Sequence, residues 1–321
     1  MTALVTGGTG YIATRLIADL LAQGTTVRTT VRSLDHADDV RTAVSRAGVD
    51  ASALTFTEAS LTDDAGWAEA TDGIAEVHHV ASPLVHTGTP EEVVPPARDG
   101  TLRVLRAARD AGARRVVLTS SFAAIGYTPK AVREYDERDW TDPETPGLPA
   151  YPMSKAVAER AAWDFIDREG GDLELVALNP TWVAGPTLTV AARSSLALFV
   201  GLLDGSMSVV PRQRFGVADV RDVASAHIAA MQTPDAAGKR YLLLADGPTL
   251  TYLEVAQILK DRLGPLGARI DVREAPGDEP APLTIHNERA KTELGFQPRP
   301  AADTIVDTAT SLVDLGLFAG A

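Results

Sequence analysis

The chain has 321 residues, of which 43 are acidic and 30 are basic, and its formal net charge is −13. This length buries a sizeable core, either as one large α/β domain or as a main domain with a smaller lobe. Cysteine is absent, which excludes disulfides, thiolate zinc sites and cysteine nucleophiles. The negative charge argues against nucleic acid or an anionic membrane as partner, because both bind a cationic face.

The sequence carries no pattern that sends a protein out of the cytoplasm. Its first residues enter an apolar run without the charged and hydrophobic segments of a secretory signal. No apolar run reaches the length of a membrane span. We therefore expect a cytoplasmic protein.

The first part of the chain alternates short apolar runs with amphipathic stretches. The runs predict strands at 3–5, 25–31, 53–57, 76–80 and 115–119, and the stretches predict helices at 15–22, 35–48, 63–71 and 94–111. Alternation at this spacing predicts an α/β fold with a parallel, doubly wound sheet of the Rossmann type, covered by helices on both faces. Ligands of such folds bind beyond the carboxyl ends of the strands, so the residues after each strand are site candidates.

The second part of the chain is less regular. Residues 126–149 read as a long surface loop, and a helix at 150–169 and a strand at 173–178 follow it. A further helix is expected at 222–231 with Asp222 as its cap, and others near 252–263 and 301–317. We expect a dinucleotide-binding Rossmann domain over 1–181, to which elements near 213–245 return, and a smaller substrate-binding lobe from 182–212 and 246–321.

A glycine-rich turn joins the first strand to the first helix, and it reads Thr6-Gly7-Gly8-Thr9-Gly10-Tyr11-Ile12-Ala13. Gly7 permits a tight turn, Gly10 lets the backbone approach a pyrophosphate, and the small Ala13 lets the helix pack on the strand. The free amides and the positive end of the helix dipole then face the diphosphate. Glycine turns also occur in ordinary strand-to-helix links, so the assignment depends on the residues that follow.

Arg32 and Ser33 follow the second strand, where the two nicotinamide dinucleotides are distinguished. An acidic residue at this place accepts from the ribose 2′-hydroxyl of NAD, whereas cationic groups bind the 2′-phosphate of NADP. Arg32 offers a bidentate guanidinium and Ser33 a hydroxyl, which favours NADP. The alternative is a solvated surface arginine.

Two further groups of residues have side chains that can donate a proton or a hydrogen bond to a carbonyl oxygen. Tyr151 and Lys155 are four apart, so they share one face of the expected helix, where the ammonium stabilises a phenolate. Such a tyrosine gives a proton to a carbonyl oxygen as hydride arrives. Ser120 and Ser121 follow the fifth strand and offer hydroxyls to the same oxygen, although serines there also cap helices and form turns.

Together these residues resemble the extended short-chain dehydrogenases/reductases. Within that superfamily the chain is similar to the group of dihydroflavonol reductases, cinnamoyl-CoA reductases and yeast-type aldehyde reductases. The matching motifs lie at 5–13, 30–32, 77–83, 117–121, 151–155, 178–181, 219–224 and 293–296. They span nearly the whole chain, and several subgroups of the superfamily share most of them.

The resemblance implies reversible, NADPH-dependent reduction of an aldehyde or ketone to an alcohol. Ser121 would then hold the substrate oxygen, Tyr151 would give the proton, and Lys155 would bind the nicotinamide ribose and tune Tyr151. The cofactor residues that it implies, with the 2′-phosphate pair included, are Thr6, Gly7, Gly10, Tyr11, Ile12, Arg32, Ser33, Ala81, Ser82, Pro83, Tyr151, Lys155, Pro180 and Val183. NADPH is expected in preference to NADH, although relatives usually have a lysine where this chain has His36 and an aspartate where it has Ser60-Leu61.

The substrate is expected to be a small apolar or aromatic carbonyl compound. The candidate wall residues are Leu84, Phe122, Thr181 and Phe199, with Val85, Trp182, Leu198 and Leu202 beside them. Between Thr181 and Val210 the only cationic side chain is Arg193, so a second diphosphate would find few partners there.

Other functions and other residues stay open. A nucleotide-sugar epimerase or dehydratase of the same fold is the alternative enzyme, and a non-catalytic cofactor sensor is a third hypothesis. His78 and His79 are consecutive in a strand and His227 lies in an apolar helix, so we expect them in the core and not as metal ligands. Arg212 and Arg214 either are solvated or meet an acidic substrate group. Apolar helices at 94–111 and 150–169 suit a monomer or a homodimer.

Overall fold

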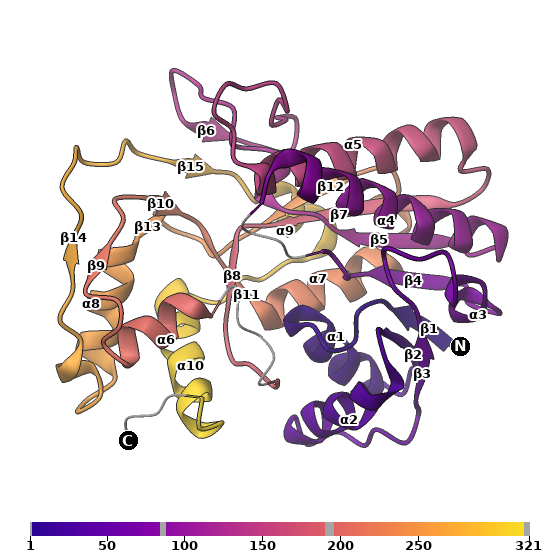
Figure 1. Ribbon diagram of the computed structural model, residues 1–321, viewed down its shortest axis with the longest axis horizontal. Coiled ribbons are helices and arrows are strands. Elements are labelled where there is room, and N and C mark those ends of the chain that lie inside the picture. The colour runs from indigo at the N-terminus through magenta and orange to yellow at the C-terminus, as the bar shows by residue number, and fades with distance from the viewer. Residues whose placement is uncertain (1, 84–87, 190–195, 318–321) are drawn as a thin grey trace.

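The computed structural model describes residues 2–83, 88–189 and 196–317, and its centre is a seven-stranded sheet (Figure 1). The strand order is β12-β7-β5-β4-β1-β2-β3, and every neighbouring pair is parallel. The strands are β1 (Thr2–Val5), β2 (Thr26–Val31), β3 (Leu54–Glu58), β4 (Glu76–His79), β5 (Arg115–Thr119), β7 (Glu174–Pro180) and β12 (Arg240–Leu243). The expected α/β fold with a doubly wound parallel sheet is confirmed.

Helices cover both faces of this sheet (Figure 1). Side chains alternate along the strands, so Leu4 and Val116 pack under α3 (Trp67–Thr71), α4 (Pro90–Asp110) and α5 (Ala150–Glu169). On the other face, Val5 and Val117 join two clusters under α1 (Tyr11–Ala22), α2 (Ala37–Arg46) and α7 (Val220–Gln232). The strands β1, β5 and β7 are buried on both faces, which explains their nearly continuous apolar runs.

The helix pair α4 and α5 lies side by side along one face of the sheet (Figure 1). The bounds of α5 match the expected helix, whereas α4 begins four residues before the expected start. A capping box of Thr89 and Glu92 explains the early start, because Thr89 N donates to Glu92 Oε2 at 2.9 Å. Prolines 95 and 96 lie in the second turn of α4.

A second cluster of elements lies away from the sheet (Figure 1). Its helices α6 (Ala197–Leu203), α8 (Tyr252–Arg262) and α10 (Ala301–Asp314) share an apolar core. The short strands are β8 (Trp182–Ala184), β9 (Val209–Val210), β10 (Arg214–Phe215), β11 (Val217–Asp219), β13 (Leu250–Thr251) and β14 (Arg273–Glu274). The exact division into two domains stays a prediction. Among the described helices, none is long and apolar enough to cross a membrane.

The segment 126–149 is more ordered than the expected surface loop. It contains β6 (Glu134–Tyr135), which pairs in parallel with β15 (Thr284–Ile285), far along the chain. Glu137 and Thr141 are also buried. Two residues of strand are too few to produce a sequence period, so only the structure reveals this pairing.

The expected cap of α7 was placed at the wrong aspartate. Asp219 caps the helix, because its side chain accepts from Arg221 N at 2.8 Å. Asp222 lies in the first turn, and its oxygens accept from the backbone N–H of Arg299, at 2.7 Å, and from the Arg299 guanidinium. The helix therefore begins two residues earlier than the apolar pattern indicates.

Candidate active site

The glycine turn after β1 packs too tightly against the rest of the protein to accept larger residues. Gly7 has φ +74°, and a Cβ added to it would lie 2.9 Å from Ala81 Cβ. A Cβ on Gly10 would lie 3.1 Å from the carbonyl oxygen of Gly7. Gly10 is also the N-cap of α1, so no side chain caps the amides of the first helical turn. This bare, positive helix end suits a diphosphate.

Buried polar side chains hold the turn against the end of β4. Thr6 Oγ1 accepts from the backbone N–H groups of Val80, at 3.1 Å, and Ala81, at 3.0 Å. Both lone pairs of this oxygen are then used, so its proton is donated to His79 Nδ1, at 2.9 Å. His79 therefore carries its own proton on Nε2. Burial lowers the pKa of His79 to about 3, and the nearby Lys155 ammonium acts in the same direction.

The other two buried histidines pack on the opposite face of the sheet. His78 and His227 meet edge to face with ring centroids 5.5 Å apart, and His227 Nε2 pairs with Thr119 Oγ1 at 2.8 Å. Both rings are buried, which confirms the expectation that they pack in the core. Burial lowers the pKa of His78 to about 3 and the pKa of His227 well below its usual value.

The end of β2 leaves one arginine without a protein contact. Arg32 is exposed and forms no hydrogen bond or ion pair with any residue in 2–83, 88–189 or 196–317. Its neighbour Arg28, by contrast, donates to the carbonyl oxygens of Glu69 and Asp72 at 2.9 and 2.8 Å. Ser33 caps a short 3-10 helix, where its hydroxyl accepts from Asp35 N at 3.3 Å. Arg32 is thus the cation at this strand end that can turn toward an anionic ligand.

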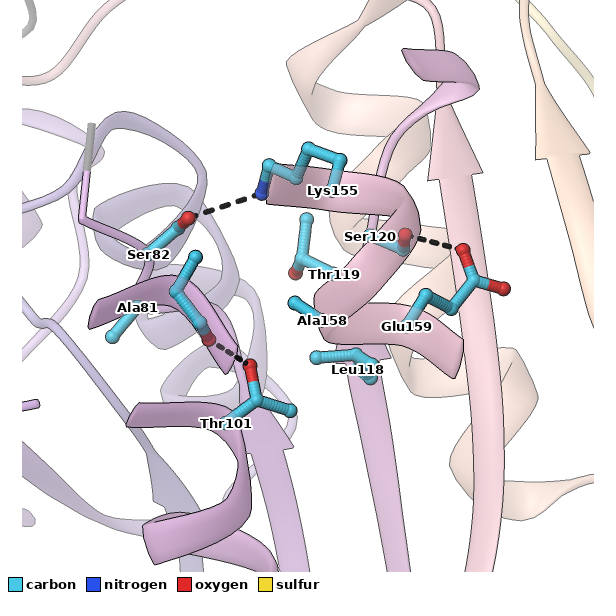
Figure 2. Close-up of a pocket in the computed structure, with 10 residues that line it drawn as sticks. Ala81, Ser82, Thr101, Leu118, Thr119, Ser120, Lys155, Ala158 and Glu159 are labelled. Atoms are coloured by element: carbon cyan, nitrogen blue, oxygen red, sulfur yellow. Dashed lines mark hydrogen bonds between the residues drawn. The ribbon is translucent and has the colours of Figure 1, made fainter. Parts of the chain in front are cut away.

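The tyrosine and lysine lie at the start of α5, where it crosses the carboxyl ends of β4 and β5. Lys155 Nζ is 5.9 Å from the centroid of the Tyr151 ring, as their separation of one helical turn predicts. Lys155 is only 8% exposed, and its Nζ donates to Ser82 Oγ at 3.1 Å (Figure 2). The hydrogen bond to Ser82, which follows β4, fixes the direction of the ammonium group.

Ser121 lies at the end of β5, opposite the first turns of α5. Its hydroxyl caps the 3-10 helix η2 (Phe122–Ala124) by accepting from Ala123 N at 3.1 Å. The hydroxyl proton is not used in that contact, so it can be donated to a ligand. Because η2 packs against α5, the structure brings Ser121 to the same end of the crevice as Tyr151 and Lys155.

A small pocket opens beneath Lys155, between α4, α5 and the ends of β4 and β5 (Figure 2). Ser120 and Glu159 line it on the α5 side, and Ser120 Oγ donates to Glu159 Oε2 at 2.5 Å (Figure 2). The complete lining is Ala81, Ser82, Ala97, Thr101, Leu118, Thr119, Ser120, Lys155, Ala158 and Glu159.

The expected substrate wall is only partly present. Phe199 is fully buried and stacks on Trp182 with ring centroids 5.2 Å apart, and Leu198 and Leu202 are buried beside it. These three residues belong to the core of the smaller cluster, because α6 turns its apolar face inward, and the expectation that they line the crevice is wrong. Leu84, Val85 and Arg193 lie outside the described residues.

Other expected wall residues stay accessible. Phe122, Thr181 and Trp182 are half-buried. Phe122 contacts the ring of Tyr127, which is 43% exposed, at a centroid distance of 6.2 Å. Pro180 and Val183, expected beside the nicotinamide, are buried at and just beyond the end of β7.

The two arginines of the smaller cluster bind protein groups. Arg212 NH1 lies 3.1 Å from carboxylate oxygens of both Glu274 and Glu279. Arg214 NH1 donates to the carbonyl oxygen of Thr249 at 2.8 Å. Their charges are therefore used to hold β9, β10 and the segments beside them.

Two features of the site were not found from the sequence. The first is the Tyr11 hydroxyl, which donates to the carbonyl oxygen of Gly185 at 2.5 Å and so ties the glycine turn to the chain beyond β8. The second is Glu159, whose buried carboxylate joins α5 to three strand ends. An isolated glutamate one turn after Lys155, on the inward face of the helix, was the available signal.

Fold and site together define a class of protein. A bare glycine turn after the first strand of a doubly wound sheet, with a Tyr and Lys pair crossing the neighbouring strand ends, is the arrangement of a dinucleotide-dependent oxidoreductase. The chain belongs to the NAD dependent epimerase/dehydratase family, whose model matches residues 3–243, and it is of the extended short-chain dehydrogenase/reductase type. The expected superfamily, and the expected class of oxidoreductase, are confirmed.

Individual relatives support the expected subgroup. The chain is 35% identical to cinnamoyl-CoA reductase 1 of Petunia hybrida, over 97% of this chain and 92% of the relative. It is 29% identical to a putative NADPH-dependent methylglyoxal reductase of Candida albicans, over 97% and 98%. It also resembles the solved yeast methylglyoxal/isovaleraldehyde reductase complexed with NADPH, with a TM-score of 0.85, 28% identity and coverage of 98% and 99%.

Proposed function

We propose that this protein reduces an aldehyde or ketone to an alcohol with NADPH, and catalyses the reverse oxidation. The observation that carries the proposal is the pair of Tyr151 and Lys155 at the start of α5, with Lys155 held by Ser82 and with η2, which Ser121 caps, packed against the same helix. The relatives named above are reductases of carbonyl compounds by their names, two of them with NADPH, which supports the same reaction here.

The residues of the crevice fit NADPH. Any Cβ on Gly7 would crowd Ala81, which keeps the turn tight, and Gly10 leaves the first amides of α1 without a side-chain cap, as a diphosphate site needs. At the far end, the guanidinium of Arg32 is exposed and has no ion-pair partner among the described residues, and it offers two parallel donors to a 2′-phosphate. A carboxylate, which would repel that phosphate, does not occupy position 32 or 33.

The chemistry follows from what each side chain can donate. Bound NADPH would supply the hydride. The hydroxyls of Ser121 and Tyr151 donate hydrogen bonds to the carbonyl oxygen, and Tyr151 transfers its proton as negative charge develops there. The Lys155 ammonium stabilises the phenolate that remains, and its hydrogen bond to Ser82 keeps it beside Tyr151.

The substrate that suits this crevice is small and apolar or aromatic. Phe122 and Tyr127 present partly accessible rings close after the end of β5, and Trp182 lies after the end of β7. Apolar surface of this kind favours aryl or alkyl groups by about 0.8 kcal/mol for each buried methylene. Arg212 and Arg214 are paired with protein groups and leave little for an anionic substrate.

The test is NADPH oxidation against a panel of carbonyl compounds, with UDP-glucose and dTDP-glucose in parallel reactions. We expect kcat/KM to rise along a homologous series of aryl or alkyl ketones and aldehydes, with no turnover of the sugar nucleotides. Formation of an epimerised or dehydrated sugar nucleotide without net NADPH consumption would contradict the proposal and favour the epimerase or dehydratase alternative.

A further inference from the structure

Glu159 carries a fully buried carboxylate on the helix that bears Tyr151 and Lys155. It follows Lys155 by four residues and Tyr151 by eight, so the three side chains occupy successive turns of one face of α5. Its side chain has 0% exposed surface, and it lines the small pocket beneath Lys155 (Figure 2). A charge placed there is costly unless its environment compensates for lost hydration.

The compensation comes from four hydrogen-bond donors. Oε1 accepts from Arg240 Nε at 2.6 Å and from Trp163 Nε1 at 3.3 Å. Oε2 accepts from Ser120 Oγ at 2.5 Å and from Asn179 Nδ2 at 2.7 Å. All four lone-pair positions of the carboxylate are occupied by donors, so the group is an acceptor-only hub.

Two of these donors bracket Ser121. Ser120 is the preceding residue, and Asn179 Nδ2 also donates to the carbonyl oxygen of Ser121, at 3.2 Å. The carboxylate therefore fixes the backbone of Ser121 from both sides while it is itself part of α5. A shift of Ser121 relative to α5 would break at least one of these contacts.

Arg240 connects the hub to the segment 126–149. Its NH1 donates to the carbonyl oxygens of Glu137, at 2.9 Å, and Asp139, at 2.7 Å, and its guanidinium lies 3.7 Å from the centroid of the Trp140 ring. Buried ion pairs are often no more stabilising than apolar groups of similar volume. A gain in stability alone therefore does not explain the buried Glu159 carboxylate. Its contacts do explain it, because they fix the position of β5 relative to α5.

We propose that Glu159 is a positioning residue, which sets Ser121 at the correct place relative to Tyr151 through Ser120 and Asn179. The inference rests on the roles given to Ser121 and Tyr151 in the proposed function. An amide cannot replace the carboxylate, because its NH2 group would face two donors. In Glu159→Gln, either Arg240 and Trp163 or Ser120 and Asn179 lose their acceptor. If Asn179 rotates to offer its unpartnered Oδ1, it releases the Ser121 carbonyl.

The test compares Glu159→Gln with Asp222→Asn. Asp222 is also a buried carboxylate with an arginine partner, but it lies on α7, on the other face of the sheet. We expect Glu159→Gln to lower kcat about tenfold or more, with the Kd for NADPH and the KM for the carbonyl substrate within twofold of wild type. Asp222→Asn should lower Tm while kcat stays within twofold. Asn179→Ala keeps the ion pair of Glu159 and Arg240 and should also lower kcat about tenfold or more. This variant provides the test if Glu159→Gln does not fold.

The outcomes separate the two proposals. If Glu159→Gln and Asn179→Ala keep wild-type kcat while Tyr151→Phe is inactive, the positioning role is wrong and the proposed function stands. If Glu159→Gln, Asn179→Ala and Asp222→Asn all lose kcat to the extent that they lose Tm, Glu159 has only a structural role. That result also overturns the inference. If Tyr151→Phe retains wild-type turnover, the proposed role of Tyr151 is wrong, and the inference about Glu159 loses its basis.

Discussion

At one end of the crevice Lys155 is 8% exposed and donates to Ser82, whereas at the other end Arg32 is exposed and has no hydrogen bond or ion pair in the described part of the chain. In the proposed function, Lys155 belongs to the reacting end, which the protein fixes before a ligand arrives, and Arg32 belongs to the adenosine end, which the ligand orders. Groups that act in the chemical step gain from fixed geometry, because no reorganisation is needed during reaction. A mobile arginine loses side-chain entropy on binding, so it contributes more modestly to affinity. Changes at the two ends should therefore affect different kinetic constants.

The largest effect is expected from removing the tyrosine hydroxyl at the reacting end. Tyr151→Phe should lower kcat by about 10²-fold or more, because proton transfer by a positioned side chain typically contributes that much. The Kd for NADPH, measured by fluorescence titration, should stay close to wild type. Tyr241→Phe is the matched control, since its hydroxyl donates to Glu293 Oε2 at 2.8 Å and has no role in our proposal. Wild-type kcat in Tyr151→Phe would remove Tyr151 from the mechanism.

Acid should destabilise the whole fold, because His78 and His79 at the end of β4 are buried. The pKa values of His78 and His79 are lowered to about 3, whereas an unfolded chain protonates histidine near 6.5. Between these values the unfolded state binds more protons, so the free energy of unfolding falls as pH falls. At pH 5 the loss is about 2 kcal/mol for each histidine.

His78 allows this pH dependence to be tested. Its Nδ1 has no hydrogen-bond partner among the described residues, so His78→Leu removes a titrating group at little cost in hydrogen bonding. Thermal unfolding between pH 7.5 and pH 5.0 should show a smaller decrease in Tm for this variant than for wild type. An equal decrease in both proteins would show that His78 does not contribute.

At the adenosine end, Arg32→Asp should change cofactor preference and leave kcat almost unchanged. The variant loses a charge-assisted contact and gains a repulsion, so kcat/KM for NADPH should fall about tenfold or more relative to NADH. Arg98→Asp serves as a control for overall charge, because Arg98 is paired with Asp99 on α4. Equal kcat/KM for the two cofactors in wild type would identify Arg32 as a surface arginine only.

The smallest effects should distinguish the accessible aromatic residue from the buried one. Phe122→Leu should raise KM for an aromatic ketone by a factor of about five, which corresponds to about 1 kcal/mol of lost ring contact. Phe199→Leu should leave KM unchanged and lower Tm, since Phe199 is fully buried against Trp182. The opposite pattern would place Phe199 in the substrate site.

The sequence predicts most of the sheet, because strands buried on both faces leave continuous apolar runs. The bounds of α5 are correct, and the residues that follow β1, β4, β5 and β7 meet at one edge of the sheet as the alternation implies. The Tyr151 and Lys155 pair is predictable for a simpler reason. Its geometry depends only on helical spacing.

Contacts between distant segments are not predictable in the same way. The ion pair of Glu159 and Arg240 joins residues that are 81 apart, and nothing local in the sequence marks one as the partner of the other. The inward orientation of Phe199 depends on how α6 packs against Trp182 and Phe215. From the sequence alone, an apolar side chain at such a position is equally consistent with a pocket wall and with a core. Long-range packing decides such cases.

The position of β12 has a consequence for synthesis of the chain. β12 is the outermost strand beside β7, and it enters the sheet about sixty residues after β7 has ended. Until residues 240–243 leave the ribosome, the edge of β7 carries unpaired backbone groups on a strand whose side chains are largely apolar. Such an edge invites pairing with other chains, so a nascent or truncated protein that stops near residue 181 should aggregate. The segments between β7 and β12 must therefore be made before the seven-stranded sheet is complete, and the two clusters of elements cannot be separated by cutting the chain.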